Sequence, residues 1–412
     1  MTQSILILGD GQLARMLLEA AKPPKLDVWA LGSSLSSPAA QVSKQFIASE
    51  RPLAESILLA LDEIETSQNS SRDHKVIVTF ESEFQDTTAL AGLSELNSEI
   101  NSEMIKPTGL QFLPDLKSIS LLQDKLSQKK LLKQNGLETS KFVVMNESSI
   151  DSLKKFSEDA VLKFSRMGYD GKGCFFFGAS STQKELNLFF QRAELNQAQI
   201  YAEQRVNFRR ELSKVAVSHE AGISFYGMIE TFQKDGICLA AWPAALTEQL
   251  AKKEEAIEAA IRKLLLKIQF RGVVAFELFE TRDDLLVNEL APRVHNSAHL
   301  TLMSSRCSQF EAHLRAISSL EVDEKTLAFE KDVLMINLIA MVSGFPSENL
   351  INGVRRLGSV YWYDKKELRP GRKMGHILKE IPSFQTESQR IRFINDEIAN
   401  ATSNWERLQN EG

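Results

Sequence analysis

The feature that most constrains the fold of this chain is the order of its first segments, which alternate between strand and helix patterns. Ser4–Leu8 is a short apolar run, Leu13–Ala21 has apolar residues at helical spacing, and Asp27–Leu31 again has the pattern of a strand. A strand, a helix and a second strand joined by short turns form a βαβ unit, which requires a parallel sheet. A further apolar run at Val76–Phe80 extends the pattern, so residues 1–110 are predicted to form a doubly wound α/β domain.

The remaining sequence is long enough for further domains. A chain of 412 residues is expected to form two or three domains, each with its own core. Apolar residues make up 43% of the chain and charged residues 25%, which is typical of a globular protein and excludes a disordered one. The net charge of -5 argues against nucleic-acid binding as the main function, because such domains usually carry a basic excess.

The cysteines and the apolar runs bear on the compartment. Cys174, Cys238 and Cys307 lack CxxC spacing, so we expect neither a disulfide framework nor a structural zinc site, and a reducing, cytoplasmic location. The first residues lead directly into a strand without the pattern of a secretory leader. No window approaches 18 consecutive apolar residues, so we expect no membrane partner.

The central and C-terminal parts mix helix and strand patterns. Helices are predicted at Leu121–Gln134, with a stop at Asn135–Gly136, and at Glu254–Ile268. Strands are predicted at Phe142–Met145, Ala160–Phe164, Cys174–Phe177, Val273–Phe279 and Leu285–Glu289, the last two forming a hairpin around Thr281–Asp284. From about Asp332 the chain is strand-like again and reaches a basic turn at Arg369–Lys373. The pattern therefore predicts α/β and α+β parts in one chain.

The turn Gly9–Ala14 between the first strand and helix matches the form GxGxx(G/A). Its glycines would let the backbone approach a phosphate at the positive end of the helix. A dinucleotide site also needs an acidic residue at the end of the second strand, where this chain has Ala30–Ser34. Two interpretations stay open, a site for a phosphate ester and a plain tight turn.

Glu277 and Glu289 lie in the two strands of the predicted hairpin, which would place their carboxylates side by side. Neighbouring carboxylates repel unless a cation lies between them. With Asn288 as a neutral oxygen donor, the set suits Mg²⁺ held together with substrate phosphates. The alternative is a solvated hairpin with ordinary surface acids.

A lysine followed by a glycine-rich loop offers a second candidate site. Lys163 lies in an apolar strand, and the basic loop Gly168–Gly173 follows closely. Such a pair can fix a polyphosphate and then cover it from water, although an edge-strand lysine and an ordinary turn would look the same. The segment Asn288–His299 collects an acid, an arginine, two histidines and amides, and is predicted to be a binding loop. Its histidines lack zinc-site spacing.

In this order, these elements resemble the N5-carboxyaminoimidazole ribonucleotide synthases, which are ATP-grasp ligases, over nearly the whole chain. Four blocks carry the resemblance: Gly168–Gly173 (GYDGKG), Asn288–Ser297 (NELAPRVHNS), Ser308–Ile317 (SQFEAHLRAI) and Arg369–His376 (RPGRKMGH). The resemblance implies an ATP-grasp fold with a Rossmann-like pre-ATP-grasp domain at residues 1–110. It further implies an ATP-grasp domain at residues 111–320, whose lid subdomain spans about residues 140–205, and a small β-rich C-terminal domain at residues 321–412.

The resemblance also implies a reaction of purine biosynthesis. ATP, bicarbonate and 5-aminoimidazole ribonucleotide would give ADP, phosphate and the N5-carboxylated nucleotide through carboxyphosphate. ATP and Mg²⁺, with two ions, would be the cofactors, and the protein would be a cytoplasmic homodimer. Such a reaction needs positioning and charge stabilisation but no covalent enzyme intermediate.

Site residues follow from the resemblance, position by position. The ATP phosphates would contact Lys125, Lys163, Gly168, Tyr169, Asp170, Gly171, Lys172 and Gly173, the adenine Glu203, Gln204, Arg205 and Val206, and the ribose Glu211. Magnesium would be held by Glu277, Glu289 and Asn288. The ribonucleotide and the bicarbonate-derived group would contact Asp170, Arg293, His295, Arg372 and Lys373, and the ribonucleotide also Gly11, Gln12, Leu13 and Glu81.

Several positions depart from the family pattern. Asp10 and Ala14 replace glycines, and Asp10 brings a negative charge toward the expected substrate phosphate unless its side chain points away. Lys125 stands where relatives have arginine, which keeps the charge and loses the planar fork. Ser218–His219, Thr231 and Ala298 also differ from the pattern. The alternatives are therefore another ATP-grasp carboxylate-amine ligase, such as the formate-using purine enzyme, and a non-catalytic, nucleotide-binding paralogue.

Overall fold

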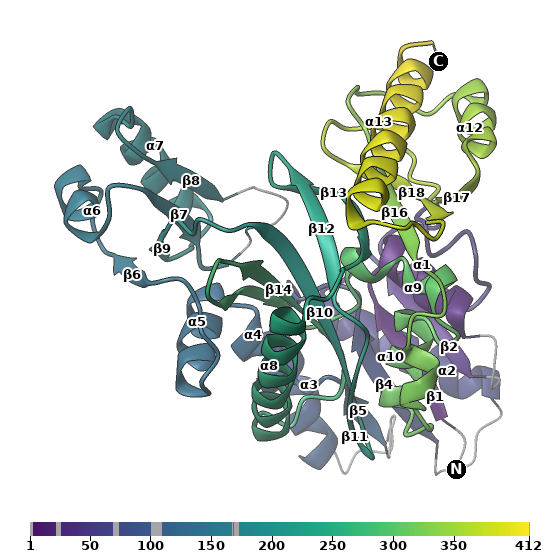
Figure 1. The fold of residues 1–412 in the computed structure, drawn as a ribbon. Helices are drawn as coiled ribbons and strands as arrows, with labels where there is room; N and C mark the ends of the chain where they lie inside the picture. Colours follow the sequence, from purple (N-terminus) through teal and green to yellow (C-terminus); the bar gives the residue numbers. More distant parts are fainter. Residues whose placement is uncertain are drawn as a thin grey trace.

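Three β-sheets organise the protein in the computed structural model, which describes residues 3–21, 26–68, 74–99, 109–166, 168 and 173–411 (Figure 1). One is a parallel sheet in the N-terminal domain, one a four-stranded antiparallel sheet in a projecting lobe, and one a nine-stranded antiparallel sheet between them. The protein is therefore a mixed α/β structure, as expected from the sequence for an ATP-grasp fold.

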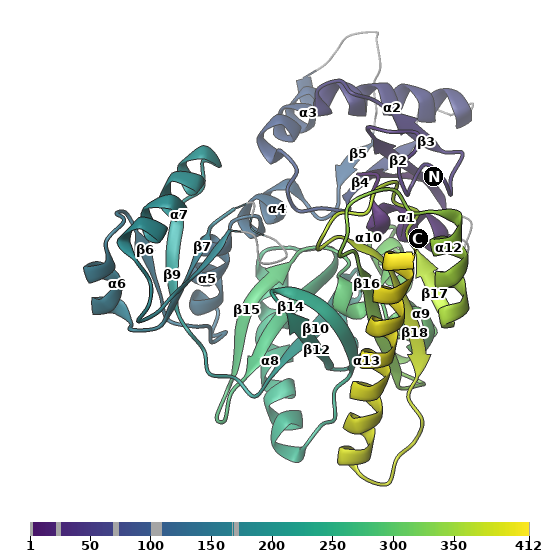
Figure 2. The same ribbon diagram turned by 90° about the horizontal axis from the view of Figure 1, so that it is seen from above.

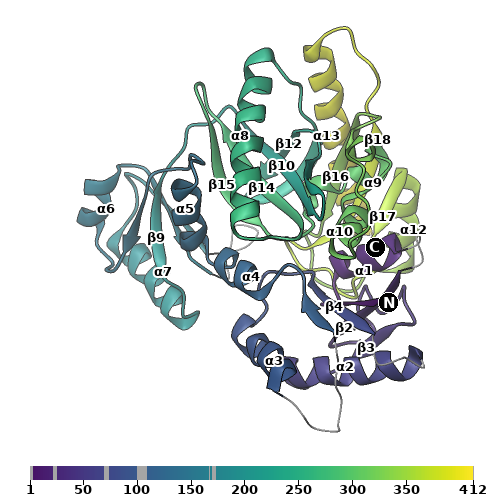
Figure 3. The ribbon, with the colours of Figure 1, turned by 90° about the horizontal axis from the view of Figure 1, so that it is seen from below.

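The N-terminal sheet has the strand order β3-β2-β1-β4-β5, and its strands pair in parallel. Helix α1 begins directly after the glycine turn, as predicted, and helices α2 and α3 lie together on the outer side of the sheet (Figure 3). The elements are β1 (Gln3–Leu8), α1 (Gln12–Ala20), β2 (Asp27–Gly32), β3 (Phe46–Ala48), α2 (Leu53–Gln68), β4 (Lys75–Phe80), α3 (Thr87–Glu99) and β5 (Leu110–Phe112). The predicted doubly wound arrangement is present in the described residues.

The helix predicted at Leu121–Gln134 is divided in two, so that prediction was wrong at its start. Helix α4 (Leu116–Leu122) ends before α5 (Lys125–Gln134) begins. Asp124 breaks the continuity because its backbone is extended and its carboxylate caps the amide of Ser127 at 2.8 Å. The predicted stop is confirmed, with Gly136 in the left-handed region at φ +74°. The break places Lys125 in the first turn of α5.

A small lobe follows, with the sheet order β6-β9-β7-β8 and the helices α6 and α7 (Figure 2). Three of its strands were predicted, and β9 was not. Thr182 and Glu185 form a capping box at the start of α7. The elements are β6 (Phe142–Met145), α6 (Ile150–Phe156), β7 (Ala160–Phe164), β8 (Cys174–Phe177), α7 (Gln183–Leu195) and β9 (Ile200–Gln204).

The central sheet has the order β15-β14-β10-β12-β13-β16-β18-β17, with β11 paired to β10. The predicted hairpin of β14 and β15 is confirmed, and α8 starts earlier than predicted because Thr247 caps it. The elements are β10 (Arg210–His219), β11 (Gly222–Phe225), β12 (Ile229–Lys234), β13 (Ile237–Pro243), α8 (Glu248–Lys267), β14 (Gly272–Glu280), β15 (Leu285–Ala291), η1 (Asn296–Ala298), α9 (Thr301–Ser304), α10 (Gln309–Ile317) and α11 (Glu324–Leu327).

The C-terminal segment continues this central sheet, since β16 pairs with β13 and β18 pairs with β16. Helices accompany its strands, and the long α13 runs along the sheet (Figure 1). The elements are β16 (Val333–Ile339), α12 (Glu348–Val354), η2 (Arg355–Leu357), β17 (Ser359–Trp362), β18 (Lys373–Glu380) and α13 (Glu387–Glu411). The basic turn therefore leads into a strand of the same sheet that contains the acidic hairpin.

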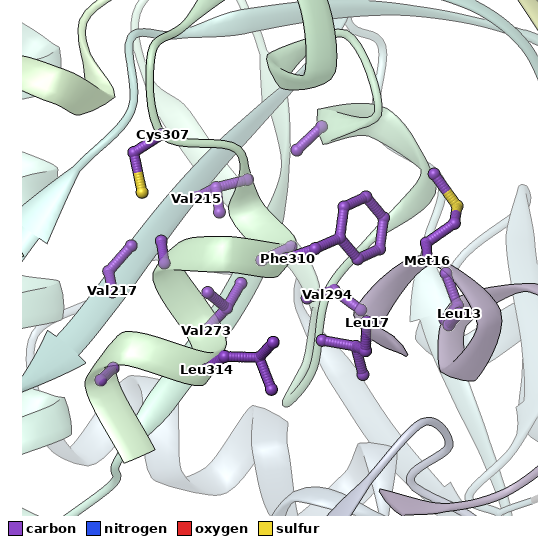
Figure 4. Close-up of a cluster of buried hydrophobic side chains, with 14 of the residues drawn as sticks. Leu13, Met16, Leu17, Val215, Val217, Val273, Val294, Cys307, Phe310 and Leu314 are labelled. Atoms are coloured by element: carbon purple, nitrogen blue, oxygen red, sulfur yellow. The ribbon is translucent and has the colours of Figure 1, made fainter. Parts of the chain in front are cut away.

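The largest core joins the N-terminal domain to the central sheet. Leu13, Met16 and Leu17 of α1 meet Phe310 and Leu314 of α10, which covers valines of β10 and β14 (Figure 4). Each of these buried apolar side chains contributes about 1.5–3 kcal/mol by leaving water. The two domains thus share one apolar interface, which fixes the N-terminal turn relative to the central sheet.

His313 of α10 ties the same interface together with hydrogen bonds. Its Nε2 lies 2.8 Å from the hydroxyl of Thr79 in β4, and its Nδ1 accepts from the amide of Val273 in β14 at 3.1 Å. Burial lowers the pKa of His313 to about 4, so the ring is neutral and structural. Among the described residues, no helix combines the length and the apolar character needed to cross a bilayer.

Candidate functional site

The acidic hairpin brings three oxygen donors together through a bulge. Glu277 of β14 lies opposite Glu289 of β15, and the register then shifts so that Asn288 is the extra residue. Because a bulged residue can turn toward the face it would otherwise leave, Asn288 reaches Glu277, with its Nδ2 3.5 Å from Oε2. The predicted cluster of Glu277, Asn288 and Glu289 is therefore present.

The two carboxylates differ in their electrostatics. Burial, and then the charge of Glu289, raise the pKa of Glu277 to about 7. For Glu289, burial acts in the same direction, but Lys125 and Lys163 outweigh it and lower its pKa. Lys125 makes the difference, because its Nζ lies 2.5 Å from Oε2 of Glu289. A divalent cation beside Glu277 would relieve the repulsion that this carboxylate experiences.

Both predicted phosphate lysines reach this cluster. The position of Lys125 is set by the start of α5, where its amide donates to the carbonyl of Ser165 at 2.7 Å. Lys163 of β7 donates to Oδ1 of Asn288 at 3.0 Å, and its Nζ lies 3.4 Å from Glu203. Lys163 thus bridges the lobe and the central sheet.

The predicted binding loop places His295 beside the acids. Its Nε2 lies 3.4 Å from Oε1 of Glu277, and its Nδ1 lies 2.9 Å from the hydroxyl of Ser297. The amide of Ser297 points to the same Nδ1 at 3.4 Å, so Nδ1 accepts and Nε2 carries the proton toward Glu277. Burial, then the charges of Arg293 and Lys373, lower the pKa of His295 to about 3. The ring is neutral at pH 7.

Two further predicted residues, Arg293 and Lys373, act on the charge of His295, and a third, Arg372, precedes Lys373. Arg293 forms an ion pair with Glu83, and its Nη2 donates to Oε1 of that glutamate at 3.1 Å. Lys373 at the start of β18 is close enough to depress the pKa of His295. Arg372 lies in the adjoining turn and donates to the carbonyl of Glu367 at 3.0 Å. The basic turn and the binding loop therefore converge, although their segments are about 80 residues apart in sequence.

The N-terminal turn is organised by Glu81. The carboxylate of Glu81 accepts from the amides of Gly11 at 2.8 Å and of Ala14 at 2.9 Å. A phosphate at the start of α1 would use the same amides, which in this structure donate to Glu81. Burial raises the pKa of Glu81. Gln12 and Leu13 begin α1, and the side chain of Leu13 belongs to the core.

Asp10 points away from this turn. Its carboxylate accepts from the amide of Ser33 at 2.9 Å, at the end of β2. A Cβ on Gly32 would lie only 2.2 Å from Cβ of Asp10, which shows how closely Asp10 lies against that strand. The negative charge that replaces a glycine in the family pattern is therefore directed to β2.

The predicted nucleotide hinge follows β9. Glu203 is buried in this strand and Gln204 ends it, while Arg205 and Val206 continue into the loop. Gln204 donates to the carbonyl of Lys141 at 2.8 Å, and Arg205 donates to that of Asp159 at 3.2 Å, so the hinge is fixed to both neighbours. Burial acts to raise the pKa of Glu203, but Lys163 and Lys129 outweigh it and lower the pKa to about 2, so this carboxylate is ionised.

Glu211 lines a cavity together with Glu277 and Asn288 of the acidic hairpin. The cavity has an empty volume of about 310 Å³, and its lining includes Glu211, Thr231, Glu277, Asn288 and His295. Burial raises the pKa of Glu211 to about 7, with Lys163 opposing. The cavity connects the predicted ribose contact to the predicted acceptor residues.

Part of the glycine loop lies outside the described residues. Tyr169, Asp170, Gly171 and Lys172 belong to that part, so their predicted roles are not tested by the structure. Gly168 is buried, and Gly173 has φ +77° with its carbonyl accepting from Phe164 at 2.9 Å. A Cβ on Gly173 would lie 2.8 Å from the ring of Phe164, which favours glycine at this end of the loop.

Three residues that contact the predicted site residues were not predicted from the sequence. Glu83, which pairs with Arg293, follows the end of β4, where ligand-binding residues of a parallel sheet are expected. Lys129 and Ser140 lie behind Glu203, at 3.2 Å and 2.7 Å from its carboxylate oxygens. Lys129 lies between the apolar residues of α5, and a lysine on a buried helix face is a signal that could have been used.

The other departures from the family pattern have local structural roles. Ser218 donates to the carbonyl of Phe270 at 2.6 Å, and His219 contacts Ser224. Thr231 lies opposite Glu211 in the sheet and lines the cavity. Ala298 is fully buried, as is Ala14 in α1. Among the described residues, no group of three or more histidine, cysteine, aspartate or glutamate side chains is arranged to hold a metal.

Comparison with known proteins gives matches along almost the entire chain. Residues 1–102 match the ribonucleotide synthetase preATP-grasp domain, residues 130–310 the ATP-grasp domain, and residues 333–379 the phosphoribosylaminoimidazole carboxylase C-terminal domain. The N5-carboxyaminoimidazole ribonucleotide synthase of Synechococcus elongatus is 32% identical, over 98% of this chain and 95% of its own length.

Solved structures give the same result. The carboxyaminoimidazole ribonucleotide synthase from Aspergillus clavatus, complexed with ATP, superposes with a TM-score of 0.78 at 26% identity, covering 97% of this chain and 99% of its own. The synthase of the same organism in complex with ADP and 5-aminoimidazole ribonucleotide gives a TM-score of 0.77 at 25% identity, with the same coverage.

Proposed function

The chain belongs to the N5-carboxyaminoimidazole ribonucleotide synthase family of ATP-grasp ligases, and on this basis we propose that its site uses ATP to carboxylate 5-aminoimidazole ribonucleotide with bicarbonate. The product is N5-carboxyaminoimidazole ribonucleotide, an intermediate of purine biosynthesis. The active synthase is favoured over a formate-using ligase and over a non-catalytic paralogue by the residues that the site retains.

The observation that carries the proposal is a continuous set of contacts across the cleft. Lys163 contacts Asn288, Asn288 contacts Glu277, and Glu277 contacts His295. This set of contacts connects the lysines, which suit ATP phosphates, with His295. Beside His295 lies a basic group, formed by Arg293 and Lys373 together with the adjoining Arg372, which suits an anionic acceptor. Phosphoryl transfer needs both within one site, because the donor and the acceptor must meet in line.

Magnesium fits the acidic part of the site. Glu277, Glu289 and Asn288 can offer oxygen atoms as metal ligands. The pKa of Glu277 is raised by burial and by Glu289, so a nearby positive charge would stabilise its ionised form. Mg²⁺ bound there with the ATP phosphates would neutralise charge that develops during phosphoryl transfer. The ammonium group of Lys125 already compensates part of the negative charge of Glu289. Two ions remain part of the proposal.

The lysines handle the nucleotide phosphates. Lys125 and Lys163 place two ammonium groups beside the acids, and each can donate a hydrogen bond to a phosphate oxygen. The γ-phosphoryl group passes from ATP to an oxygen of bicarbonate, giving carboxyphosphate and ADP. The glycine loop from Gly168 to Gly173, including Tyr169, Asp170, Gly171 and Lys172, is proposed to cover the phosphates and exclude water.

The basic group receives the acceptor. Arg293, Lys373 and Arg372 are proposed to bind the phosphate of the ribonucleotide and the carboxyphosphate, and neutral His295 offers its Nε2 proton to an oxygen that gains charge. The exocyclic amine attacks the carboxyl carbon, phosphate leaves, and the nitrogen loses a proton. Gly11, Gln12, Leu13 and Glu81 are proposed to hold the ribonucleotide from the N-terminal domain.

The adenosine part of ATP is assigned to the other end of the cleft. Glu203, Gln204, Arg205 and Val206 are proposed to contact adenine, and Glu211 the ribose. In this arrangement the acids meet the metal, and the bases meet phosphate and carboxyphosphate. The domain boundaries at residues 110 and 320, the lid at about residues 140–205, the cytoplasmic location and the homodimer are also proposed, on the family resemblance.

An ADP-release assay with each substrate omitted in turn tests the function. Release is expected to require both bicarbonate and 5-aminoimidazole ribonucleotide, and formate is expected not to replace bicarbonate. ATP turnover that is indifferent to both substrates would exclude the proposed function. Turnover that depends on formate would instead establish the related ligase.

A further inference from the structure

A buried lysine lies directly behind the proposed adenine hinge. The side chain of Lys129 in α5 is only 1% exposed, so its ammonium group is buried in the core. Its Nζ donates to the hydroxyls of Thr139 at 2.7 Å and of Ser140 at 3.0 Å, and lies 3.2 Å from Oε1 of Glu203. The residue is not among those assigned to the nucleotide, the metal or the acceptor.

Ser140 completes the surroundings of Glu203. Its hydroxyl donates to Oε2 of Glu203 at 2.7 Å, so Lys129 and Ser140 approach different oxygens of one carboxylate. Lys163, which also contacts Asn288 in the cleft, lies 3.4 Å from Oε1. The carboxylate is therefore held from behind by α5 and its following turn, and it lies beside the lysine that faces the nucleotide phosphates.

This arrangement keeps Glu203 ionised. Burial alone would raise its pKa, but Lys163, Lys129 and Ser140 lower the pKa to about 2. Lys129 itself has a pKa lowered to about 8 by burial and Lys163, against Glu203, and so is charged at pH 7. An ionised carboxylate accepts hydrogen bonds and donates none.

We propose that Lys129 and Ser140 are positioning residues that hold Glu203 as an acceptor-only carboxylate, and that this makes the site select a purine with an amino group at C6 over one with an oxo group. The inference rests on the proposed placement of adenine at Glu203. An amino group donates to the carboxylate, whereas an oxo group brings a second acceptor against it. The oxo group would then be a buried acceptor without a donor and would face a negative charge, which is costly.

Binding of ADP and of IDP, the diphosphate with an oxo group at C6, tests the proposal on the full chain. The dissociation constants are measured by calorimetry with Mg²⁺ present and without ribonucleotide or bicarbonate. Wild-type protein is expected to prefer ADP. In Lys129→Met, the positive charge beside Glu203 is removed, so the carboxyl group can rotate or take up a proton. The preference for ADP should then fall by about tenfold or more, which is the scale of one hydrogen bond to a charged group.

Lys214→Met is the matched control. Lys214 is also a buried lysine, and it pairs with Glu254 at 2.6 Å and Glu258 at 2.5 Å on α8. Its loss disturbs a buried ion pair in the same domain without touching Glu203, so the ADP preference should stay at the wild-type value. Ser140→Ala removes a smaller group from Glu203 and should lower the preference in a protein that keeps Lys129.

The outcomes separate the two proposals. A lower ADP preference in Lys129→Met and Ser140→Ala, but not in Lys214→Met, supports the positioning role. A preference within about twofold of wild type in both Glu203-linked variants, or an equal loss in Lys214→Met, overturns it. Wild-type protein without any ADP preference would also overturn it. Failure to carboxylate the ribonucleotide would affect the proposed function alone, since this measurement needs no acceptor.

Discussion

Glu277 and Glu289 face each other across the β14–β15 hairpin, and Lys125 neutralises only one of them. Burial, and then the charge of Glu289, raise the pKa of Glu277, whereas Lys125 and Lys163 outweigh burial at Glu289 and lower its pKa. A cation bound beside Glu277, as we propose, would relieve the repulsion between the two carboxylates. The bulge turns Asn288 toward Glu277, with its Nδ2 3.5 Å from Oε2 of Glu277, while its Oδ1 accepts from Lys163.

Glu289→Gln should abolish magnesium-dependent ATP turnover while leaving the fold intact. The amide keeps the size of the side chain but removes a charge that we assign to the metal, and loss of such a charge costs about a hundredfold or more in rate. ADP release and thermal unfolding are the measurements. Glu248→Gln, at an exposed acid on α8, is the control and should behave as wild type. Wild-type turnover in Glu289→Gln would exclude the assigned role.

Lys373→Ala should impair use of the ribonucleotide more than use of ATP. Lys373 lies near His295 in the basic group, whereas the proposed nucleotide hinge is in the lobe. Loss of a charged hydrogen-bond donor should raise KM for the ribonucleotide by about tenfold or more, with KM for ATP changed much less. Initial rates with each substrate varied give both constants. Equal increases in the two would contradict the division of the site.

Glu277 should make the stability of the metal-free protein depend on pH. Its pKa rises from 4.5 unfolded to about 7 folded, so the folded state binds the proton more tightly. This stabilisation is fully present below pH 4.5 and is lost as the pH rises through about 7. The free energy of unfolding of Glu277→Gln, relative to wild type, should therefore increase by about 2 kcal/mol between pH 5 and pH 8.

Urea unfolding with a chelator at both pH values measures this difference. The buried histidines act in the opposite sense, since their lowered pKa values destabilise the fold as the pH falls below 6.5. Their effect is common to both proteins and cancels in the comparison. The same difference between variant and wild type at both pH values would contradict the raised pKa of Glu277.

Asp10→Asn should leave ribonucleotide use nearly unchanged. The carboxylate accepts from Ser33 and points to β2, and an asparagine oxygen can still accept from that amide. KM for the ribonucleotide should therefore change by less than about threefold, as expected away from a binding contact. A large fall in KM in this variant would show that the charge of Asp10 does act on the substrate.

Local patterns in the sequence predicted much of the fold, because the relevant signals are short-range. The apolar runs gave β1, β4 and the β14–β15 hairpin, and the glycine turn gave the start of α1. The break before α5 was missed because Asp124 can either continue an amphipathic pattern or cap a new helix, and only its extended backbone decides. The strands between residues 200 and 243 were not predicted either.

The candidate site could be predicted where residues are close in sequence, and only partly where they are not. Glu277, Asn288 and Glu289 share one hairpin, so their meeting follows from its register. The ion pair of Glu83 with Arg293 joins segments that are 210 residues apart in the sequence, so no pattern of neighbouring residues could have predicted it. Lys129 was missed although its place on the buried face of α5 is a local signal, because its partner Glu203 lies far along the chain, on strand β9 of the lobe.

Transfer of oxygen from bicarbonate to phosphate tests the central claim most directly. The reaction is run with ATP, the ribonucleotide and bicarbonate enriched in oxygen-18, and the phosphate released is examined by mass spectrometry. If the γ-phosphoryl group passes to bicarbonate in the cleft between Lys163 and His295, each phosphate should carry one labelled oxygen. Release of ADP with unlabelled phosphate would contradict the account, because the phosphoryl group would then have gone to water or to another acceptor.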